Sequence, residues 1–260
     1  MGFKVDGYGI VYLDENTDMF GDTRLSHNPT CTKTLCKEDP IFIYSLFLRK
    51  RNRTKKRDVG DNCPLIYALK SKENLKVTYN SIKPVILLLN DIIDKFLEQQ
   101  LAMGCNFEAI VPVPSNHKIV RILSRRLGKK LNIPVEENLF RKARNDDIKG
   151  QLLLDKFGNN AVPQGARVNI MNAVGNADKN GKDFSISDVK TKNRKYVKPV
   201  IFNEETDSNK YRSIVLVDDV CSTGSTLVHA KDALHLNSFC SQIVAVCLFS
   251  PLSGRLKERI

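Results

Sequence analysis

Two apolar runs near the end of the chain flank a stretch with helical periodicity. Residues 213–217 and 243–249 lack the polar alternation of a half-exposed strand, which predicts strands buried on both faces, as in a parallel sheet. Residues 226–236 between them place apolar side chains at helical spacing, and residues 218–225 predict a tight polar loop. The order strand, loop, helix, strand predicts a βαβ unit.

A second unit of the same kind lies in the middle of the chain. Residues 108–114 predict a buried strand that stops at a proline, and residues 115–118 predict a short polar loop. Residues 119–131 predict a helix with one apolar face, and a strand-like piece begins at 133–135. Two such units predict an α/β fold with a parallel, Rossmann-like sheet.

The N-terminal half adds two clear elements to this core. Residues 41–48 predict another buried strand, and residues 85–96 predict a helix that packs on the core and carries no chemistry. We therefore expect a small N-terminal extension over residues 1–63, forming part of a hood over the site, and a main domain over residues 64–260.

The segment 142–200 is rich in Asn, Lys, Gly and Asp and has weak periodicity. From Lys142 to Asp188 we expect mostly a long, mobile connection, with short strands such as 167–170. A loop of this length inside a compact domain is unusual unless it has a function, for example as a lid. The sequence therefore predicts a flexible insertion at about 142–200 that closes over a site.

The charge of the chain favours polyanionic ligands. There are 41 Lys and Arg residues against 29 Asp and Glu, a formal net charge of +12. Seven of the nine residues from Arg49 to Arg57 are basic. A solvated, mobile loop explains this stretch, and a contact site for nucleic acid or a partner protein is the alternative. No aromatic residue lies among them to stack on bases, which weighs against the alternative.

The cysteines and the apolar stretches bear on the compartment. The 7 cysteines are odd in number and irregularly spaced, which does not predict a secreted disulfide framework. No apolar run is long enough to span a bilayer, and no signal-peptide core follows Met1. We therefore expect a cytoplasmic protein. Cys31, Cys36 and Cys63 could ligate zinc with His27, but their spacing is poor and unliganded thiols fit better.

Candidate chemistry concentrates at the carboxyl end of the strand at 213–217. Asp218 and Asp219 stand at the edge where open parallel sheets bind ligands. A glycine among hydroxyl side chains follows at the start of a helix: Ser222, Thr223, Gly224, Ser225 and Thr226. Unsatisfied N–H groups at a helix start bind phosphate, and two carboxylates can accept hydrogen bonds from sugar hydroxyls and hold a hydrated Mg²⁺ through water. A phosphorylated sugar satisfies all of these groups.

This segment resembles the signature of type I phosphoribosyltransferases, in which four apolar residues, two acids and two further residues precede a hydroxyl-rich loop with glycine. Residues 110–114, which end Pro-Val-Pro, and residues 67–70 resemble the ComF-like (competence-protein) branch of that family. The chain departs from that branch at 120–123, where an Arg-Gly-Phe-Asn run is usual. It also has no zinc ribbon of paired Cys-x-x-Cys.

The resemblance implies a phosphoribosyltransferase-like fold and a Mg²⁺-dependent transfer of phosphoribosyl from 5-phosphoribosyl-1-pyrophosphate to an acceptor, with release of pyrophosphate. It implies that residues 222–226 bind the 5′-phosphate and that Asp218 and Asp219 are the catalytic and magnesium-binding residues. The pyrophosphate would face Ser115, Asn116, His117 and Lys118. The insertion offers three candidates for closing on the site: Lys149, Arg167 and Arg194. No motif identifies the acceptor.

Other functions remain open at this point. An acid pair after an apolar strand also occurs in nucleotide triphosphatases, but their Gly-x-x-x-x-Gly-Lys-Ser/Thr loop is absent from the chain. The pair could also simply cap the next helix. A second hypothesis is a catalytically silent module that senses phosphoribosyl pyrophosphate and binds nucleic acid or a protein partner through Arg49 to Arg57. Fold resemblance alone does not separate enzyme from sensor.

Overall fold

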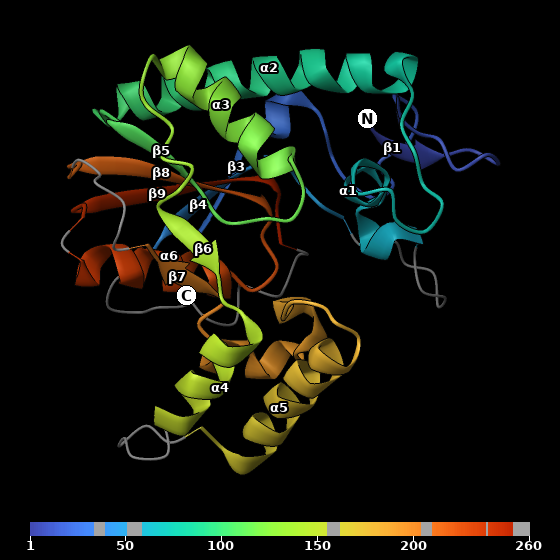
Figure 1. The fold of residues 1–260 in the computed structure, drawn as a ribbon. Helices are drawn as coiled ribbons and strands as arrows, with labels where there is room; N and C mark the ends of the chain where they lie inside the picture. The colour runs from blue at the N-terminus through green and yellow to red at the C-terminus, as the bar shows by residue number, and fades with distance from the viewer. Residues whose placement is uncertain (34–39, 51–58, 155–161, 204–209, 238, 252–260) are drawn as a thin grey trace.

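The centre of the fold is a five-stranded sheet in the order β3-β4-β9-β8-β5 (Figure 1). The computed structural model describes residues 1–33, 40–50, 59–154, 162–203, 210–237 and 239–251. The strands of the sheet are β3 (Thr30–Lys33), β4 (Phe42–Phe47), β5 (Ala109–Pro112), β8 (Ser213–Val220) and β9 (Gln242–Phe249). Neighbours among β4, β9, β8 and β5 are parallel, and β3 adds an antiparallel edge. The predicted α/β class with a mostly parallel sheet is confirmed.

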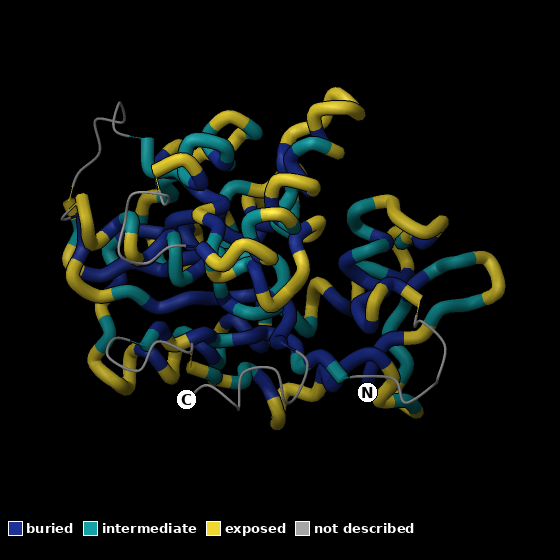
Figure 2. Tube along the Cα trace, turned by 90° about the horizontal axis from the view of Figure 1, so that it is seen from below, coloured by how far each residue is buried: buried dark blue, intermediate teal, exposed yellow. Residues whose placement is uncertain are grey.

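Helices cover both faces of this sheet. Figure 1 shows α2 (Tyr79–Ala102) and α3 (Ile119–Leu131) over one face and α6 (Ser225–Leu236) over the other. Along β8, Val215 belongs to the hydrophobic core under α2 and α3, whereas its neighbour Ile214 belongs to the core under α6. Because both faces are buried, the strand needs no polar alternation. Figure 2 shows long buried stretches of chain running through the middle of the molecule. The strands expected at 41–48, 108–114 and 243–249 are confirmed in the same way.

The helix expected at 85–96 is confirmed and is longer than predicted. It begins after Thr78, whose side chain accepts a hydrogen bond from the backbone of Ser81, while the Ser81 side chain accepts one from the backbone of Thr78. Val85, Ile92 and Phe96 lie on its buried face. Helix α3 has the predicted limits and places its apolar face on the sheet.

The piece predicted as a strand at 133–135 contributes only an isolated parallel bridge between Val135 and Ile110. Gly128 of α3 lies against it. A Cβ atom at position 128 would lie 2.6 Å from Val135 Cγ2, so glycine allows the helix to approach the chain that follows it.

The N-terminal residues belong partly to the central sheet. A separate hairpin comes first, formed by β1 (Gly2–Val5) and β2 (Val11–Asp14). Phe3 of this hairpin packs on the rings of Phe47 and Phe249, with centroids 5.8 and 5.6 Å away. The described part of this region also holds three short helices: η1 (Leu25–His27), η2 (Val59–Asn62) and α1 (Pro64–Leu69). Because β3 and β4 pair into the main sheet, the division expected between residues 63 and 64 does not separate this sheet from the N-terminal part.

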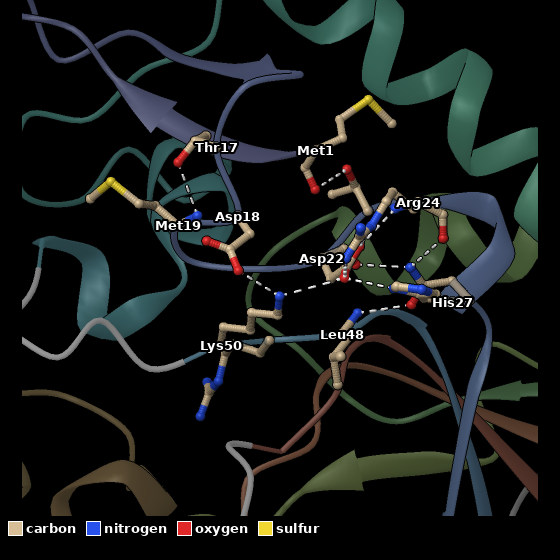
Figure 3. A network of polar contacts seen from close by, with 12 residues as sticks. Met1, Thr17, Asp18, Met19, Asp22, Arg24, His27, Leu48 and Lys50 are labelled. Atoms are coloured by element: carbon tan, nitrogen blue, oxygen red, sulfur yellow. Dashed lines mark hydrogen bonds and ion pairs between the residues drawn. The ribbon is translucent and has the colours of Figure 1, made fainter.

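A buried carboxylate fastens the N-terminal segment to the end of β4 (Figure 3). The Asp22 side chain is 2% exposed; its Oδ1 accepts a hydrogen bond from Arg24 Nε at 2.9 Å, and its Oδ2 lies 2.8 Å from His27 Nδ1. Lys50 Nζ lies 3.5 Å from Asp22 Oδ2. The Asp22 backbone exchanges hydrogen bonds with Leu48. The bond from Arg24 holds the pKa of Asp22 far below its usual range.

Replacing Asp22 with asparagine should lower the free energy of unfolding by about 1–3 kcal/mol at pH 7, since charge-assisted hydrogen bonds are lost in a buried place. A carboxyl whose pKa is lowered by folding stabilises the fold above its unfolded pKa of about 3.9 and loses this effect as the pH falls toward the folded value. The difference between parent and Asp22→Asn in urea unfolding should therefore shrink as the pH falls below about 4.

Asp18→Asn is the matched control, because Asp18 pairs with Lys50 but its side chain is 70% exposed. It should change the free energy of unfolding by no more than about 0.5 kcal/mol. Equal stability of Asp22→Asn and parent at pH 7 would contradict the role given to the buried carboxylate.

The segment 142–200 is largely helical, contrary to expectation. It leaves and rejoins the core at an antiparallel pair, β6 (Phe140–Lys142) with β7 (Val200–Phe202). The described part between them holds four helices: α4 (Asn145–Leu154), α5 (Gln164–Lys179), η3 (Ile186–Asp188) and η4 (Thr191–Tyr196). The short strand expected at 167–170 is wrong, since these residues lie inside α5. Figure 1 shows α4 and α5 side by side beyond β6 and β7.

A hydrophobic core of its own holds this helical insertion together. Ile148 and Leu152 of α4 meet Ile170 and Val174 of α5 in a cluster separate from the two cores of the sheet. Much of the buried face of α5 is alanine, at positions 166, 173 and 177. Alanine is the strongest helix former but gives a weak apolar signal, so the sequence of this helix shows little periodicity.

Within the described part of the chain, none of the helices combines the length and apolar character needed to cross a membrane.

Candidate functional site

The two acids lie within a strand, not in a loop as predicted. Strand β8 continues to Val220 because β9 runs beside it that far, with Asp218 opposite Cys247 and Val220 opposite Phe249. Asp218 and Asp219 therefore occupy fixed positions near the carboxyl end of a central parallel strand. Ligands of open α/β sheets bind at this edge.

The carboxylates of Asp218 and Asp219 are crowded. Asp218 Oδ1 accepts a hydrogen bond from the Asp219 backbone N–H at 2.8 Å. Burial, and then the charge of Asp219, raises the pKa of Asp218 to about 7. Lys70, which directly follows α1, forms an ion pair with Asp219. Two adjacent carboxylates with one paired lysine leave room for further positive charge.

A hydroxyl-lined turn follows the acids. Gly224 has a φ of 72°, in the left-handed region that glycine adopts most readily, and it directly precedes the first residue of α6. Thr223 Oγ1 lies 2.8 Å from Ser225 Oγ across this turn. The first N–H groups of α6 have no partner inside the helix and point out of its end. A helix start of this kind is suited to an anion, so phosphate binding by residues 222–226 stays a prediction.

One cavity of about 540 Å³ joins the predicted site residues. Asp218, Asp219 and all five residues of the turn at 222–226 line it, together with Ser115, Asn116 and His117 from the loop after β5. Lys118, the fourth residue predicted for that loop, is not part of this cavity. It is exposed and lines a neighbouring cavity of about 590 Å³, because the chain turns away there into α3.

Cations surround this cavity. Five basic side chains line it: Arg49, Lys70, Lys72, Lys142 and Arg194. Burial, followed by repulsion from Lys70, lowers the pKa of Lys142. Burial and the charges of Lys70 and Lys72 likewise lower the pKa of His117. Basic groups that compete with one another in this way favour an anionic ligand.

Of the three insertion residues considered for closing on the site, one lines the cavity and two do not. Arg194 lines the cavity, and its guanidinium donates hydrogen bonds to the carbonyls of Val189 and Ser187. Lys149 instead bonds to Asp146 and Asp178 in the insertion. Arg167 donates to the Leu152 carbonyl, also in the insertion. Among the described residues of the insertion, the stretch from Phe184 to Arg194 contributes a wall of the site, together with the two ends of the insertion at Lys142 and at 199–200.

Four of these five basic residues have no place in the site that the sequence predicts. Lys70 lies in the 67–70 stretch, which carries a resemblance and no assigned role, and Lys72 lies just beyond it. Lys142 opens the segment expected to be mobile. Arg49 belongs to the basic stretch that ends at Arg57, for which the sequence suggests a nucleic-acid or protein contact. It is in fact 4% exposed, and its neighbour Lys50 pairs with Asp18 and Asp22. Residues 51–57 lie outside the described residues, so a nucleic-acid or protein contact there stays a prediction.

For metals, the described residues hold no group of three or more His, Cys, Asp or Glu side chains that could bind an ion. Cys31 is exposed on β3 and Cys63 is buried before α1, while Cys36 lies outside the described residues. Asp218 and Asp219 suit a magnesium ion held through water, since a cation relieves the repulsion that, after burial, raises the pKa of Asp218.

No protein-family model matches the chain, and no curated protein sequence does. Solved structures give faint similarities. One is adenine phosphoribosyltransferase from Leishmania tarentolae, with a TM-score of 0.35 and 10% identity over 99% of this chain and 98% of that one. Another is adenine phosphoribosyltransferase from Leishmania donovani, with a TM-score of 0.34 and 10% identity over 96% of this chain and 86% of that one. Likeness at this level does not establish a family, so function has to be inferred from the site.

Proposed function

We propose that the protein is a Mg²⁺-dependent phosphoribosyltransferase that binds 5-phosphoribosyl-1-pyrophosphate and transfers its phosphoribosyl group to an acceptor. One observation carries this proposal: an acid pair at the end of β8 and a glycine-containing hydroxyl turn line the same cation-rich cavity. Carboxylates suit a sugar diol, and the helix start suits a phosphate. A phosphorylated pentose carries both a diol and a phosphate, and could therefore contact the acid pair and the turn that follows it at the same time.

In this proposal the turn at 222–226 holds the 5′-phosphate through backbone N–H groups and hydroxyls. Asp218 and Asp219 accept hydrogen bonds from the ribose hydroxyls and so fix the sugar ring. These contacts involve groups of the sugar that do not react. Their binding energy holds C1 in the orientation needed for displacement.

The loop at 115–117 faces the departing pyrophosphate, with Lys70 and Lys142 supplying positive charge beside it. The bond from C1 to the pyrophosphate oxygen breaks as a nucleophilic atom of the acceptor bonds to C1 from the opposite side. Asp218 and Asp219 would hold Mg²⁺ through water, and the ion, when bound, neutralises charge on the pyrophosphate. The insertion wall near Arg194 limits access of water to the sugar.

Among phosphoribosyltransferases we propose a place near the ComF-like branch. Residues 67–70 and 110–114 carry that resemblance, and Tyr67, Lys70, Val113 and Pro114 all line the cavity. We also propose a cytoplasmic location, supported by free thiols at the six cysteines described.

Release of pyrophosphate from the sugar substrate tests the proposed reaction. With Mg²⁺ present, an acceptor panel should include a compound that raises the release rate well above slow hydrolysis. Chelation of Mg²⁺ should abolish this release. If the sugar binds tightly with Mg²⁺ but no pyrophosphate is released under any condition, the proposed transferase activity is wrong and a sensing module is favoured instead.

A further inference from the structure

Arg49 is a buried cation at the same edge of the sheet as the acid pair. It follows the end of β4 by two residues, and β4 is parallel to β9, with Phe47 opposite Phe249. Its backbone N–H donates to Ser250 Oγ at 2.8 Å, which fixes the chain there. The residue is 4% exposed and lines the cavity.

Among the residues the structure describes, no carboxylate forms an ion pair with the guanidinium of Arg49, although acids line the same cavity. Its Nε is buried without a hydrogen-bond partner. The neighbouring thiol of Cys63 gives no anion, because burial raises its pKa to about 12. A buried, unpaired guanidinium is costly, so a cavity lined by one is suited to a ligand that brings an anionic group.

The order of the strands places Arg49 on a particular side of the site. The loop proposed to face the pyrophosphate follows β5, on one side of β8, whereas Arg49 follows β4, on the other side with β9 between. Displacement at C1 requires the acceptor to approach opposite the leaving pyrophosphate. Given the proposed function, Arg49 therefore lies on the acceptor's side of the sugar.

We propose that Arg49 binds a carboxylate on the acceptor, so that the acceptor is a nitrogen nucleophile carrying an acidic group rather than an uncharged base. A guanidinium pairs with a carboxylate through two parallel hydrogen bonds, which fixes position and orientation together. The lone pair of the acceptor nitrogen forms the new bond to C1, and the C1–O pair leaves with pyrophosphate. Any proton on that nitrogen passes to solvent. This inference rests on the proposed transferase activity and adds the chemical class of its acceptor.

The test compares matched acceptors that differ in charge: nicotinate with nicotinamide, orotate with uracil, and anthranilate with aniline. Pyrophosphate release should rise with at least one carboxylate and not with its uncharged counterpart. In Arg49→Gln, the KM for that carboxylate should rise about 10- to 100-fold while the Kd for the sugar pyrophosphate stays within about twofold. Arg49→Lys should recover only part of the loss, because lysine cannot pair through two bonds in a plane.

Lys129→Gln is the control, since Lys129 is an exposed cation of α3 that lines neither cavity and should leave the KM for the carboxylate nearly unchanged. Thermal unfolding of each variant checks that it is folded. The inference is overturned if no carboxylate surpasses its uncharged partner, or if Arg49→Gln leaves the KM for the carboxylate unaltered. If the parent protein does not bind the sugar pyrophosphate at all, the proposed function fails first, and this outcome is distinguishable in the same preparations.

Discussion

The double variant Asp218→Asn/Asp219→Asn should lose pyrophosphate release by at least about 100-fold in kcat/KM. Asparagine keeps the shape of both side chains but removes the charges that would hold the hydrated Mg²⁺, and it weakens the acceptors for the ribose hydroxyls. Initial rates of pyrophosphate release at several sugar concentrations give the measurement. The loss should appear in kcat as well as in KM, because the ion acts on the departing group.

The double variant should remain folded. Burial and repulsion from Asp219 disfavour the charged form of Asp218, so removing that charge does not destabilise the fold. Asp61→Asn is the matched control: Asp61 is an exposed carboxylate that lines the same cavity. It should change kcat/KM by less than about threefold, in line with a weak effect of exposed charges. Comparable losses in Asp61→Asn and the double variant would mean that the cavity responds to net charge and that the acid pair has no special role.

Gly224→Val should weaken binding of the sugar pyrophosphate by about 100-fold, the equivalent of losing two charge-assisted hydrogen bonds. At a φ of 72°, a branched side chain forces the backbone out of the left-handed region and turns the N–H groups of the cradle away. The substitution should also cost about 1–2 kcal/mol of folding free energy. Equilibrium dialysis with labelled sugar and thermal unfolding measure the two effects separately.

Gly181→Val separates backbone strain from the loss of the cradle. Gly181 has a φ of 59°, and beyond its two chain neighbours no atom lies within 4 Å of where its Cβ would stand. It lies after α5, outside the cavity, so its substitution should lower stability to a similar degree and leave sugar binding intact. Equal weakening of binding in both glycine variants would show that Gly224 acts through general stability.

Much of the sheet could be predicted because its strands are buried on both faces. The apolar runs at 213–217 and 243–249 have no plausible place outside such a sheet, and the helices beside them repeat apolar residues at clear intervals. The helices of the insertion could not be predicted, because their buried faces show little apolar contrast. Its helix α5 buries alanines at 166, 173 and 177, which carry little apolar contrast against the many Asn and Lys residues around them. Its core depends on contacts with α4 that no local pattern reveals.

The part of the site whose residues are neighbours in the sequence could be predicted. The part that is assembled by the fold from distant segments could not. Asp218, Asp219 and the turn after them form one continuous string, so their chemistry is readable together. Lys70, Lys142 and Arg49 come from three distant segments that meet only at the carboxyl edge of the sheet. The resemblance implies that Lys118 faces the pyrophosphate with the rest of its loop, whereas the structure places Lys118 just before α3, where it lines the neighbouring cavity.

The most direct test is equilibrium dialysis of the protein against 5-phosphoribosyl-1-pyrophosphate with and without Mg²⁺. We predict one saturable site per chain, with a Kd between about 1 μM and 1 mM. Removal of Mg²⁺ or the substitution Gly224→Val should abolish or greatly weaken that binding. Absence of any saturable, Mg²⁺-dependent binding up to about 1 mM sugar, or binding that Gly224→Val and Asp218→Asn/Asp219→Asn leave intact, would contradict a sugar-phosphate site at the end of β8.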